Sequence, residues 1–393
     1  MCGIAGFINL SGVPADPSTL VRMTDVQRHR GPDDQGFRLF SLKSGGSEAL
    51  QAGDLSPRPA FEGALGFNRL KILDLSQCGH QPMTNADGTV LLAFNGEIYN
   101  AFDYRSELAA SGFRFRSRTD TEVILYLYEK YGLDGMLERL NGMFAIVIVD
   151  LRSREIHIAR DHFGIKPFYW ARQGATVMFA SEAKAFLSHP AFHAELDSAH
   201  LDEYLTFRFI AGEESLLKDV RQLRPGHCLR ITPEGVSTRA YWRLPDRERR
   251  EIGDAEAIGQ FEEVLRGSVK SQLLSDVKVG CQLSGGIDSS VVSVFARSHF
   301  DADMETFSIV FEDPRFYIQI LFWLEGTTDI HQHEFSGAFH VMHGSSIHAR
   351  YEFEKARPHA AHIWLRKAIG MPLPCGPVPG NRLWSGIPSI DHQ

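Results

Sequence analysis

The chain has 393 residues, of which 43% are hydrophobic, and its formal net charge is −8 at pH 7. This length allows two domains of roughly 100–200 residues, each with apolar residues enough for a core. The charge has no basic surplus, which excludes nucleic acid as the main partner, and the longest apolar run, residues 317–324, is far shorter than the roughly 20 residues of a membrane span.

Cys2 is the first feature in chain order. Removal of Met1 would leave a residue that carries both a thiol and a free α-amine. The ordinary pKa of an α-amine is about 7.7–8.0 and that of a thiol about 8.5, so part of the amine is neutral near pH 7 and can accept the thiol proton. The position after Met1 does not by itself show that a cysteine is a nucleophile, so the assignment of Cys2 depends on motifs elsewhere in the chain.

The first half of the chain is rich in short β-branched and aromatic runs separated by turn residues. These runs predict strands at 89–94, 144–149, 155–159 and 176–180. Between them, the apolar residues of 121–131 recur at helical spacing and predict a helix. Strands with a helix between them predict a layered α+β domain.

The second half has a different pattern. A polar, charged stretch at 245–254 is the candidate linker, and 255–274 predicts an amphipathic helix. A strand at 278–283, a glycine-rich loop, a helix at 289–298 and a strand at 306–311 then predict one parallel βαβ unit. The predicted apolar face of the amphipathic helix consists of Ile258, Phe261, Val264, Leu265 and Val269.

Several polar motifs follow the stretch Cys2-Gly3-Ile4-Ala5-Gly6-Phe7. They are Arg28-His29-Arg30-Gly31-Pro32-Asp33-Asp34, Arg69-Leu70, Asn95-Gly96-Glu97-Ile98-Tyr99-Asn100, Arg118-Thr119-Asp120-Thr121-Glu122 and Ser284-Gly285-Gly286-Ile287-Asp288-Ser289-Ser290. In this order and spacing, the motifs before residue 123 resemble the class II glutamine amidotransferase domain, an N-terminal-nucleophile hydrolase. With the last motif, the whole resembles the family of glutamine-hydrolysing asparagine synthetases. The resemblance runs from Cys2 to about Pro314 and cannot be followed beyond Phe316.

This resemblance implies a domain organisation. An N-terminal αββα sandwich of the N-terminal-nucleophile hydrolase type is expected over 2–210, followed by a connecting segment over 211–254. An α/β domain with a parallel sheet and a pyrophosphate loop is expected to begin over 255–316. The remaining residues, 317–393, are expected to form a diverged or irregular tail.

Asn95 and Gly96 are the candidate oxyanion hole. An asparagine amide and an unobstructed glycine N–H can converge on one developing oxyanion. Asn-Gly is also the commonest dipeptide of tight hairpins, so a purely structural turn is the alternative. The resemblance assigns the pair, together with Cys2, to catalysis.

Three charged residues are implied to hold glutamine. The resemblance places Asp120 on the α-amino group, Arg69 on the α-carboxylate and Glu97 as a further contact to the amine. A carboxylate and a guanidinium fork suit a zwitterionic substrate. Alternatively, residues 119–122 scan as a capping box that puts Asp120 in the first turn of a helix.

The glycine-rich loop after 278–283 is a candidate phosphate site. Glycine N–H groups can surround phosphate oxygens, and the following helix N-terminus adds a favourable dipole. The loop lacks the Gly-Lys-Ser/Thr end of a Walker A motif, and a structural glycine-serine turn is the alternative. The resemblance implies a loop for the pyrophosphate of ATP, with Asp288 as the Mg²⁺ ligand. Its members are Leu283, Ser284, Gly285, Gly286, Asp288 and Ser289.

The tail departs from the family pattern, because the acidic loop Ser-Gly-Glu-Gly-Ala-Asp-Glu that the family places there is absent. Residues 331–393 hold eight of the 17 histidines, but their spacing repeats no metal-ligand pattern. A truncated or frame-shifted synthetase domain explains the change better than a metal cluster. The five cysteines are odd in number and scattered, which predicts reduced thiols in a cytoplasmic protein.

The resemblance implies an ATP-dependent amidotransferase. Cys2 would release ammonia from glutamine, and the second domain would use ATP to adenylate aspartate, giving asparagine, AMP and pyrophosphate. The expected partners are glutamine, aspartate and ATP, without nucleic acid or membrane. Two alternatives stay open: an amidotransferase that acts on another carboxylate acceptor, and a non-catalytic remnant of such an enzyme. The oligomeric state also stays open, with a homodimer as one option.

Overall fold

The computed structural model describes residues 1–51, 53–246, 251–300, 304–308, 347–353 and 361–367. It divides into two compact units, Met1–Lys278 and Val279–Gln393. Most of the tail expected over 317–393 lies outside the described residues, as does its suggested metal cluster. Within the tail, β16 (Ile347–Phe353) pairs with β17 (Ala361–Lys367) in antiparallel fashion.

One sheet of the first unit has seven strands, paired antiparallel in the order β11-β9-β10-β1-β4-β2-β3. It places β1, which directly follows Cys2, in the middle of the sheet. Its strands are β1 (Gly3–Asn9), β2 (Asp34–Phe40), β3 (Ser47–Ala49), β4 (Gly63–Arg69), β9 (Tyr169–Gln173), β10 (Thr176–Ala180) and β11 (Val220–Gln222).

A second sheet has six antiparallel strands in the order β13-β12-β8-β7-β6-β5. The four strands predicted from the first half of the chain are confirmed, as β6, β7, β8 and β10. The strands of this sheet are β5 (Met83–Thr84), β6 (Val90–Ile98), β7 (Gly142–Asp150), β8 (Glu155–Arg160), β12 (His227–Thr232) and β13 (Gly235–Ala240).

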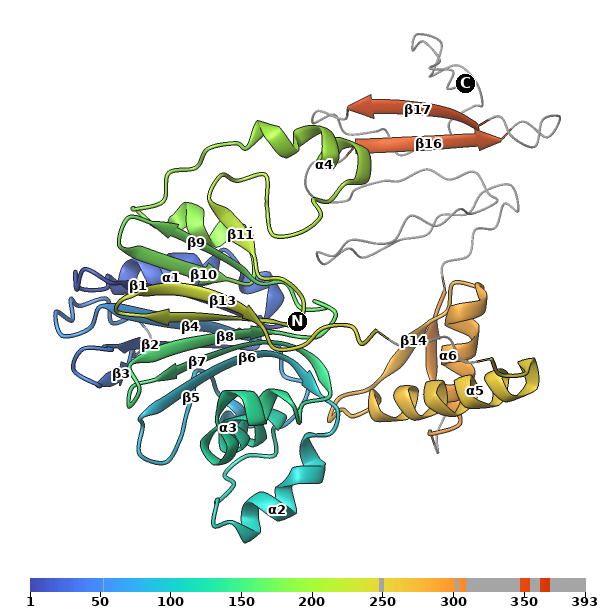
Figure 1. Cartoon of the computed structure of the whole chain (residues 1–393), viewed down its shortest axis with the longest axis horizontal. Coiled ribbons are helices and arrows are strands. Elements are labelled where there is room, and N and C mark those ends of the chain that lie inside the picture. Colours follow the sequence, from blue (N-terminus) through green and yellow to red (C-terminus); the bar gives the residue numbers. More distant parts are fainter. Residues whose placement is uncertain (52, 247–250, 301–303, 309–346, 354–360, 368–393) are drawn as a thin grey trace. The chain divides into compact units, whose positions relative to one another are not determined.

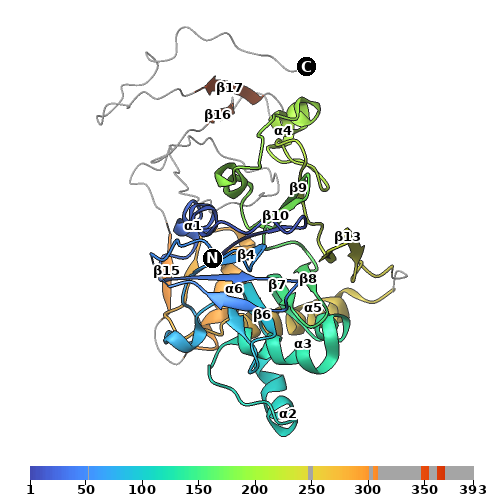
Figure 2. The same cartoon turned by 90° about the vertical axis from the view of Figure 1, so that its left-hand side faces the viewer.

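The two sheets pack face to face, and helices cover their outer faces, as Figures 1 and 2 show. In β7, Val147 points into the core shared with Ile4 of β1, whereas Ile146 packs with Val123 of α3 (Asp120–Leu137). Successive strand residues point to opposite faces, so strands buried on both sides are apolar throughout. The outer face of the first sheet packs against α1 (Pro17–Asp25). The predicted αββα sandwich is therefore confirmed.

The sequence explains both the start of the helix α3 and the interruption within it. The Thr119 side chain accepts a hydrogen bond from the N–H of Glu122 and caps the helix. The helix predicted at 121–131 is confirmed, and it is interrupted at Gly132, whose φ of 69° lies in the left-handed region that favours glycine. A further turn then continues to Leu137.

The segment expected to connect the domains, 211–254, contributes β11 to one sheet and β12 and β13 to the other. Alternating apolar residues in β12, such as Leu229 and Ile231, are fully buried between the sheets. The first unit also contains shorter elements: α2 (Arg105–Ala110), α4 (Leu201–Phe207) and the 3₁₀ helices η1 (Arg28–Arg30), η2 (Gln77–Gly79), η3 (Ala101–Tyr104), η4 (Ala183–Ser188) and η5 (Ser198–His200).

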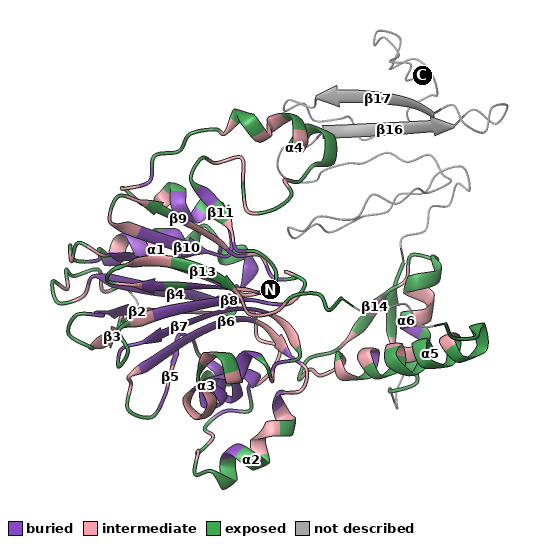
Figure 3. Cartoon of the chain, in the orientation of Figure 1, coloured by how far each residue is buried: buried purple, intermediate pink, exposed green. Residues whose placement is uncertain are grey.

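The predicted amphipathic helix is present as α5 (Asp254–Ser271). Its apolar face is largely uncovered by the described residues: Ile258, Phe261 and Val264 are 65–71% exposed (Figure 3). Only Val269 of the predicted face is buried. None of the described helices combines the length and the apolar character needed to cross a bilayer.

The second unit contains the predicted βαβ arrangement. The strands β14 (Gly280–Gln282) and β15 (Glu305–Phe307) pair in parallel, and α6 (Ile287–Arg297) lies between them in sequence. The strand predicted at 306–311 is shorter, since β15 ends at Phe307 and 309–311 lie outside the described residues. The parallel pair places the glycine-rich loop directly after β14.

Candidate active site

A cavity of about 200 Å³ brings together the six residues predicted for glutamine chemistry. They come from the start of β1, the end of β4, the end of β6 and the first turn of α3. The volume is below the roughly 300–1,000 Å³ of pockets for drug-sized ligands and suits a small ligand. The residues are Cys2, Arg69, Asn95, Gly96, Glu97 and Asp120.

Cys2 precedes β1 and faces the chain after β4. Its Sγ lies 3.4 Å from the N of Leu70 and 3.7 Å from the O of Leu70. Burial raises the pKa of the Cys2 thiol, so the thiol needs a base to become a nucleophile. The backbone oxygen of Cys2 accepts a hydrogen bond from Nε of Arg30 at 2.9 Å, which holds the residue in place.

The α-amine of the chain lies at the same cavity. Met1 lines it, and burial lowers the pKa of the Met1 α-amine. A lowered pKa means that more of the amine is neutral and able to accept a proton near pH 7. Removal of Met1 would take this amine away, expose the backbone nitrogen of Cys2 as the new α-amine and vacate the space that Met1 fills at the cavity.

Asn95 and Gly96 lie inside β6, paired with Ala145 and Phe144 of β7. The hairpin-turn interpretation of Asn95-Gly96 is therefore wrong, because the strand runs on to Ile98. The Asn95 side chain is 1% exposed, and its Nδ2 has no hydrogen-bond partner among the described residues. A buried, unpaired amide donor costs about 1–3 kcal/mol, a cost typical of a group kept for a ligand.

The N–H of Gly96 is directed away from β7. Alternate N–H groups of a strand point to the same side, and those of Phe94 and Ile98 donate to Gln81 and Asp120 rather than to β7. The N–H of Gly96 lies between them on that side. Glycine is required here, because a Cβ would collide with the carbonyl oxygen of Met143.

Asp120 lies both in the first turn of α3 and at the cavity. It opens α3 after the Thr119 cap, and its carboxylate lines the cavity. The carboxylate accepts hydrogen bonds from the N–H groups of Ile98, at 3.0 Å, and Thr121, at 2.9 Å. Burial, reinforced by the charge of Glu97, nevertheless raises the pKa of Asp120 to about 7. A cationic ligand group would reverse that effect.

Arg69 is held by its surroundings. Its guanidinium donates to the backbone oxygens of Leu73, Asp74 and Ser76 at 2.6–3.0 Å. It packs against Gly79, where a Cβ would overlap the guanidinium. These bonds fix the orientation of the cation at the cavity, where the sequence predicts recognition of a carboxylate.

Glu97 and Lys166 are charged residues of the same cavity. Burial raises the pKa of the Glu97 carboxyl, whereas it lowers the pKa of the Lys166 ammonium. Motif comparison did not single out Lys166. The only sequence signal is its place in the short Asp161–Lys166 turn after β8, where Lys166 is 6% exposed.

Glutamine affinity is expected to fall at acid pH, because the ionised form of Asp120 attracts an ammonium group and its protonated form does not. Below pH 7 the dissociation constant should rise up to about tenfold per pH unit. Titration of Cys2→Ala protein with glutamine by calorimetry from pH 5.5 to 8.5 measures this. In the Cys2→Ala, Asp120→Asn double variant the slope should disappear; a slope that persists would contradict the assignment.

The loop after β14 has the features expected of a phosphate site. Gly285 has a φ of 83° with open space where a Cβ would stand, and Gly286 precedes the first turn of α6. The Oγ atoms of Ser284 and Ser289 lie 2.9 Å apart and tie the loop to the helix. Asp288 is exposed in that first turn. Among the described residues no group of three or more metal-type ligands occurs.

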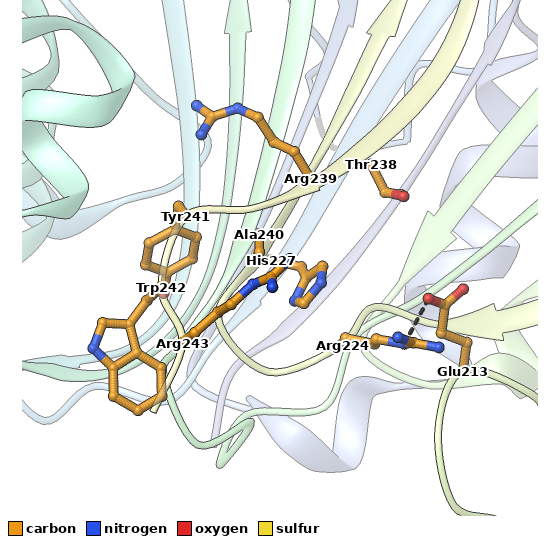
Figure 4. Close-up of a pocket in the computed structure, with 9 residues that line it drawn as sticks. All are labelled: Glu213, Arg224, His227, Thr238, Arg239, Ala240, Tyr241, Trp242 and Arg243. Atoms are coloured by element: carbon orange, nitrogen blue, oxygen red, sulfur yellow. Dashed lines mark ion pairs between the residues drawn. The ribbon is translucent and has the colours of Figure 1, made fainter. Parts of the chain in front are cut away.

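A second hollow, of about 670 Å³, lies beside β12 and β13 and contains none of the predicted site residues (Figure 4). Its two walls carry arginines that are already paired: Arg224 with Glu213 at 2.7 Å, and Arg239 with Asp134.

Comparisons with known proteins agree with the motifs. The family models for the glutamine amidotransferase domain and for asparagine synthase match residues 58–242 and 260–363. Asparagine synthetase [glutamine-hydrolyzing] 3 of Bacillus subtilis (strain 168) is 32% identical over 331 residues, covering 81% of this chain and 50% of that protein. The chain thus contains a glutamine amidotransferase domain followed by an asparagine synthase domain.

Another curated relative has a similar identity to this chain. A putative asparagine synthetase [glutamine-hydrolyzing] 2 of Methanocaldococcus jannaschii is 33% identical, covering 82% of this chain and 62% of that protein. Among solved structures, the glutamine phosphoribosylpyrophosphate amidotransferase of B. subtilis, complexed with ADP and GMP, is 19% identical with a TM-score of 0.48, covering 78% of this chain and 65% of that chain. The chain spans about half the length of the B. subtilis asparagine synthetases it matches.

Proposed function

We propose that the first unit hydrolyses glutamine and that the chain uses the ammonia for ATP-dependent synthesis of asparagine from aspartate. The observation that carries the first step is the buried, unpaired Nδ2 of Asn95 in the same cavity as the Cys2 thiol. A preorganised donor beside a nucleophile is the arrangement that acyl transfer needs. The matches to the glutamine amidotransferase and asparagine synthase family models support the same chemistry.

The mechanism follows from these groups. With Met1 removed, the α-amine of Cys2 takes the thiol proton as sulfur attacks the side-chain amide carbon of glutamine. Asn95 Nδ2 and the N–H of Gly96 stabilise the oxyanion, and the α-ammonium returns the proton to the departing nitrogen, which leaves as ammonia. Water, activated by the same amine, then cleaves the glutamyl thioester to glutamate and regenerates the thiol.

Substrate recognition uses the charged residues of the cavity. Asp120, with Glu97 beside it, holds the α-ammonium of glutamine, and the guanidinium of Arg69 holds the α-carboxylate. These contacts bind the end of glutamine that is remote from the scissile amide, so they contribute to binding in the ground state and the transition state alike.

In the second unit, the loop Leu283–Ser289 would hold the pyrophosphate of ATP. The residues with suitable groups are Ser284, Gly285, Gly286 and Ser289, and Asp288 would supply a carboxylate to Mg²⁺. ATP would activate the aspartate carboxylate as an adenylate, and ammonia would displace AMP to give asparagine.

The test uses the full chain with Met1 removal verified by mass spectrometry. Glutamate release from glutamine without ATP would support the first step, and ATP-dependent asparagine, AMP and pyrophosphate formation from aspartate and supplied ammonia would support the second. Because ammonia bypasses the first unit, each half is tested separately. Absence of glutamate release would refute the glutaminase function, and absence of asparagine the synthetase function.

Replacement of Arg69 by lysine is expected to raise the KM for glutamine about tenfold and to change kcat little, since lysine keeps the charge but loses the fork that matches a carboxylate. Steady-state glutaminase kinetics measure both constants. Arg38→Lys is the matched control, because Arg38 is an arginine of the adjacent strand β2 that does not line the cavity. Unchanged KM with a collapsed kcat would contradict the role of Arg69.

A further inference from the structure

Lys166 is a buried cation that the mechanism above does not use. It lines the cavity with Cys2 and Met1, and it is 6% exposed. Among the described residues, its ammonium has no hydrogen-bond or ion-pair partner, although burial of an unpaired charge is costly. Such a charge calls for a function at the cavity.

The backbone at Lys166 is rigidly held. The carboxylate of Asp161, itself 1% exposed, accepts hydrogen bonds from the N–H groups of Phe163, Ile165 and Lys166 at 2.9–3.1 Å. It also accepts the N–H of Phe144 in β7, at 3.1 Å. The Asp161–Lys166 turn is thereby anchored to the strand that pairs with Asn95 and Gly96, so Lys166 is presented to the cavity by the same framework as the oxyanion donors.

The other cations near Cys2 are more strongly engaged. The guanidinium of Arg30 forms an ion pair with Glu182 at 3.0 Å and donates to the backbone of Cys2. Arg69 donates to three backbone oxygens. Several titratable and charged groups from the surrounding elements line the cavity or act electrostatically on the Cys2 thiol, the Met1 α-amine or Lys166: Arg30, Asp33, Arg69, Glu97, Asp120 and Asp161.

We propose, resting on the glutaminase function above, that Lys166 is a positioning residue for the nucleophile: its positive charge keeps the α-amine of Cys2 neutral and favours the Cys2 thiolate. A nearby cation disfavours protonation of an amine and stabilises a thiolate. Both effects lower the pH at which the amine and the thiol lose their protons, so both extend activity to lower pH. Lys166 lowers the pKa of the Cys2 thiol and that of the Met1 α-amine, which is one residue from the amine that processing would create.

The experiment compares wild type, Lys166→Met, Lys166→Gln and Lys166→Arg in the processed full chain. The first readout is the pH profile of kcat/KM for glutamine. The second is the pH dependence of Cys2 alkylation by iodoacetamide, followed peptide by peptide in a mass spectrometer. Cys78, which is exposed and does not line the cavity, is an internal reference, and Lys218→Met is a control at an exposed lysine.

The two neutral variants should move the acid limb of both profiles to higher pH, by roughly one unit. Lys166→Arg should restore the wild-type position, whereas Cys78 alkylation and the Lys218→Met profiles should stay unchanged. Superimposable pH profiles in wild type and a folded neutral variant would overturn the proposal, even if kcat fell. If the wild-type chain showed no glutaminase activity, the proposed function would fail, but the alkylation profiles would still test Lys166.

Discussion

Replacement of Cys2 by alanine is expected to lower kcat for glutamine hydrolysis at least about a thousandfold, equivalent to ~4 kcal/mol of lost transition-state stabilisation. The substitution removes the attacking sulfur but leaves the α-amine and the oxyanion donors in place. Measurement of glutamate release under saturating glutamine checks the rate. Glutamine binding, measured by calorimetry, should be retained, because Arg69, Glu97 and Asp120 are untouched.

Two controls sharpen this result. Cys78→Ala removes an exposed thiol outside the cavity and should leave the rate unchanged. A chain that retains Met1 keeps the thiol but has no free α-amine on Cys2, and Met1 itself lines the cavity. It should therefore be as inactive as Cys2→Ala. Hydrolysis at the processed rate by a verified Met1-containing chain would show that the amine is not the base.

The strand pattern predicts a layered α+β domain, and the resemblance implies the αββα sandwich; the strands that could be predicted are buried on two faces. Runs such as 144–149 are apolar at every position, and they are bounded by turn residues, so both their type and their extent are visible. In the first unit only β6, β7, β8 and β10 were predicted as strands. Among those that were not, β3 and β11 have only three residues each. In β13 most residues are at least partly exposed, and a short or exposed strand has no apolar pattern that separates it from a loop.

Site residues that belong to sequence motifs could be predicted, whereas site residues outside the motifs could not. Cys2, Arg69, Asn95 and Asp120 stand in recognisable stretches, and the fold brings them to one cavity. The sequence could not reveal that the Asn95 amide has no partner within the described part of the chain, since that depends on the packing of two strands. Lys166 was missed because a single lysine in a turn looks like a surface charge in the sequence. Only the structure shows that Lys166 is buried.

The dipeptide Asn95-Gly96 also shows why local turn propensity does not predict the secondary structure here. Asn95-Gly96 has the composition of a hairpin turn, but β6 continues through it because Phe94 and Ile98 donate their N–H groups to Gln81 and Asp120. Those side chains replace a neighbouring strand on that edge. Asn141-Gly142, at the start of β7, has the same composition and lies opposite Ile98.

This second dipeptide supplies the matched control for the remaining prediction, because Asn141 is exposed and does not line the cavity. Asn95→Ala removes one oxyanion donor and should lower kcat for glutamine hydrolysis about 10²- to 10³-fold with little change in KM. Asn141→Ala should keep the wild-type kcat. Steady-state kinetics of the two variants in parallel measure the difference.

Thermal unfolding separates this role from a structural one. The Nδ2 of Asn95 has no partner among the described residues, so Asn95→Ala breaks no described side-chain hydrogen bond and removes a buried, unpaired donor. The unpaired Asn95 amide lowers the stability of the protein without glutamine, so the Tm of Asn95→Ala should stay the same or rise. The same amide stabilises the oxyanion during hydrolysis, so kcat should fall sharply. A fall in Tm accompanied by an unchanged kcat would identify Asn95 as a structural residue of β6 instead.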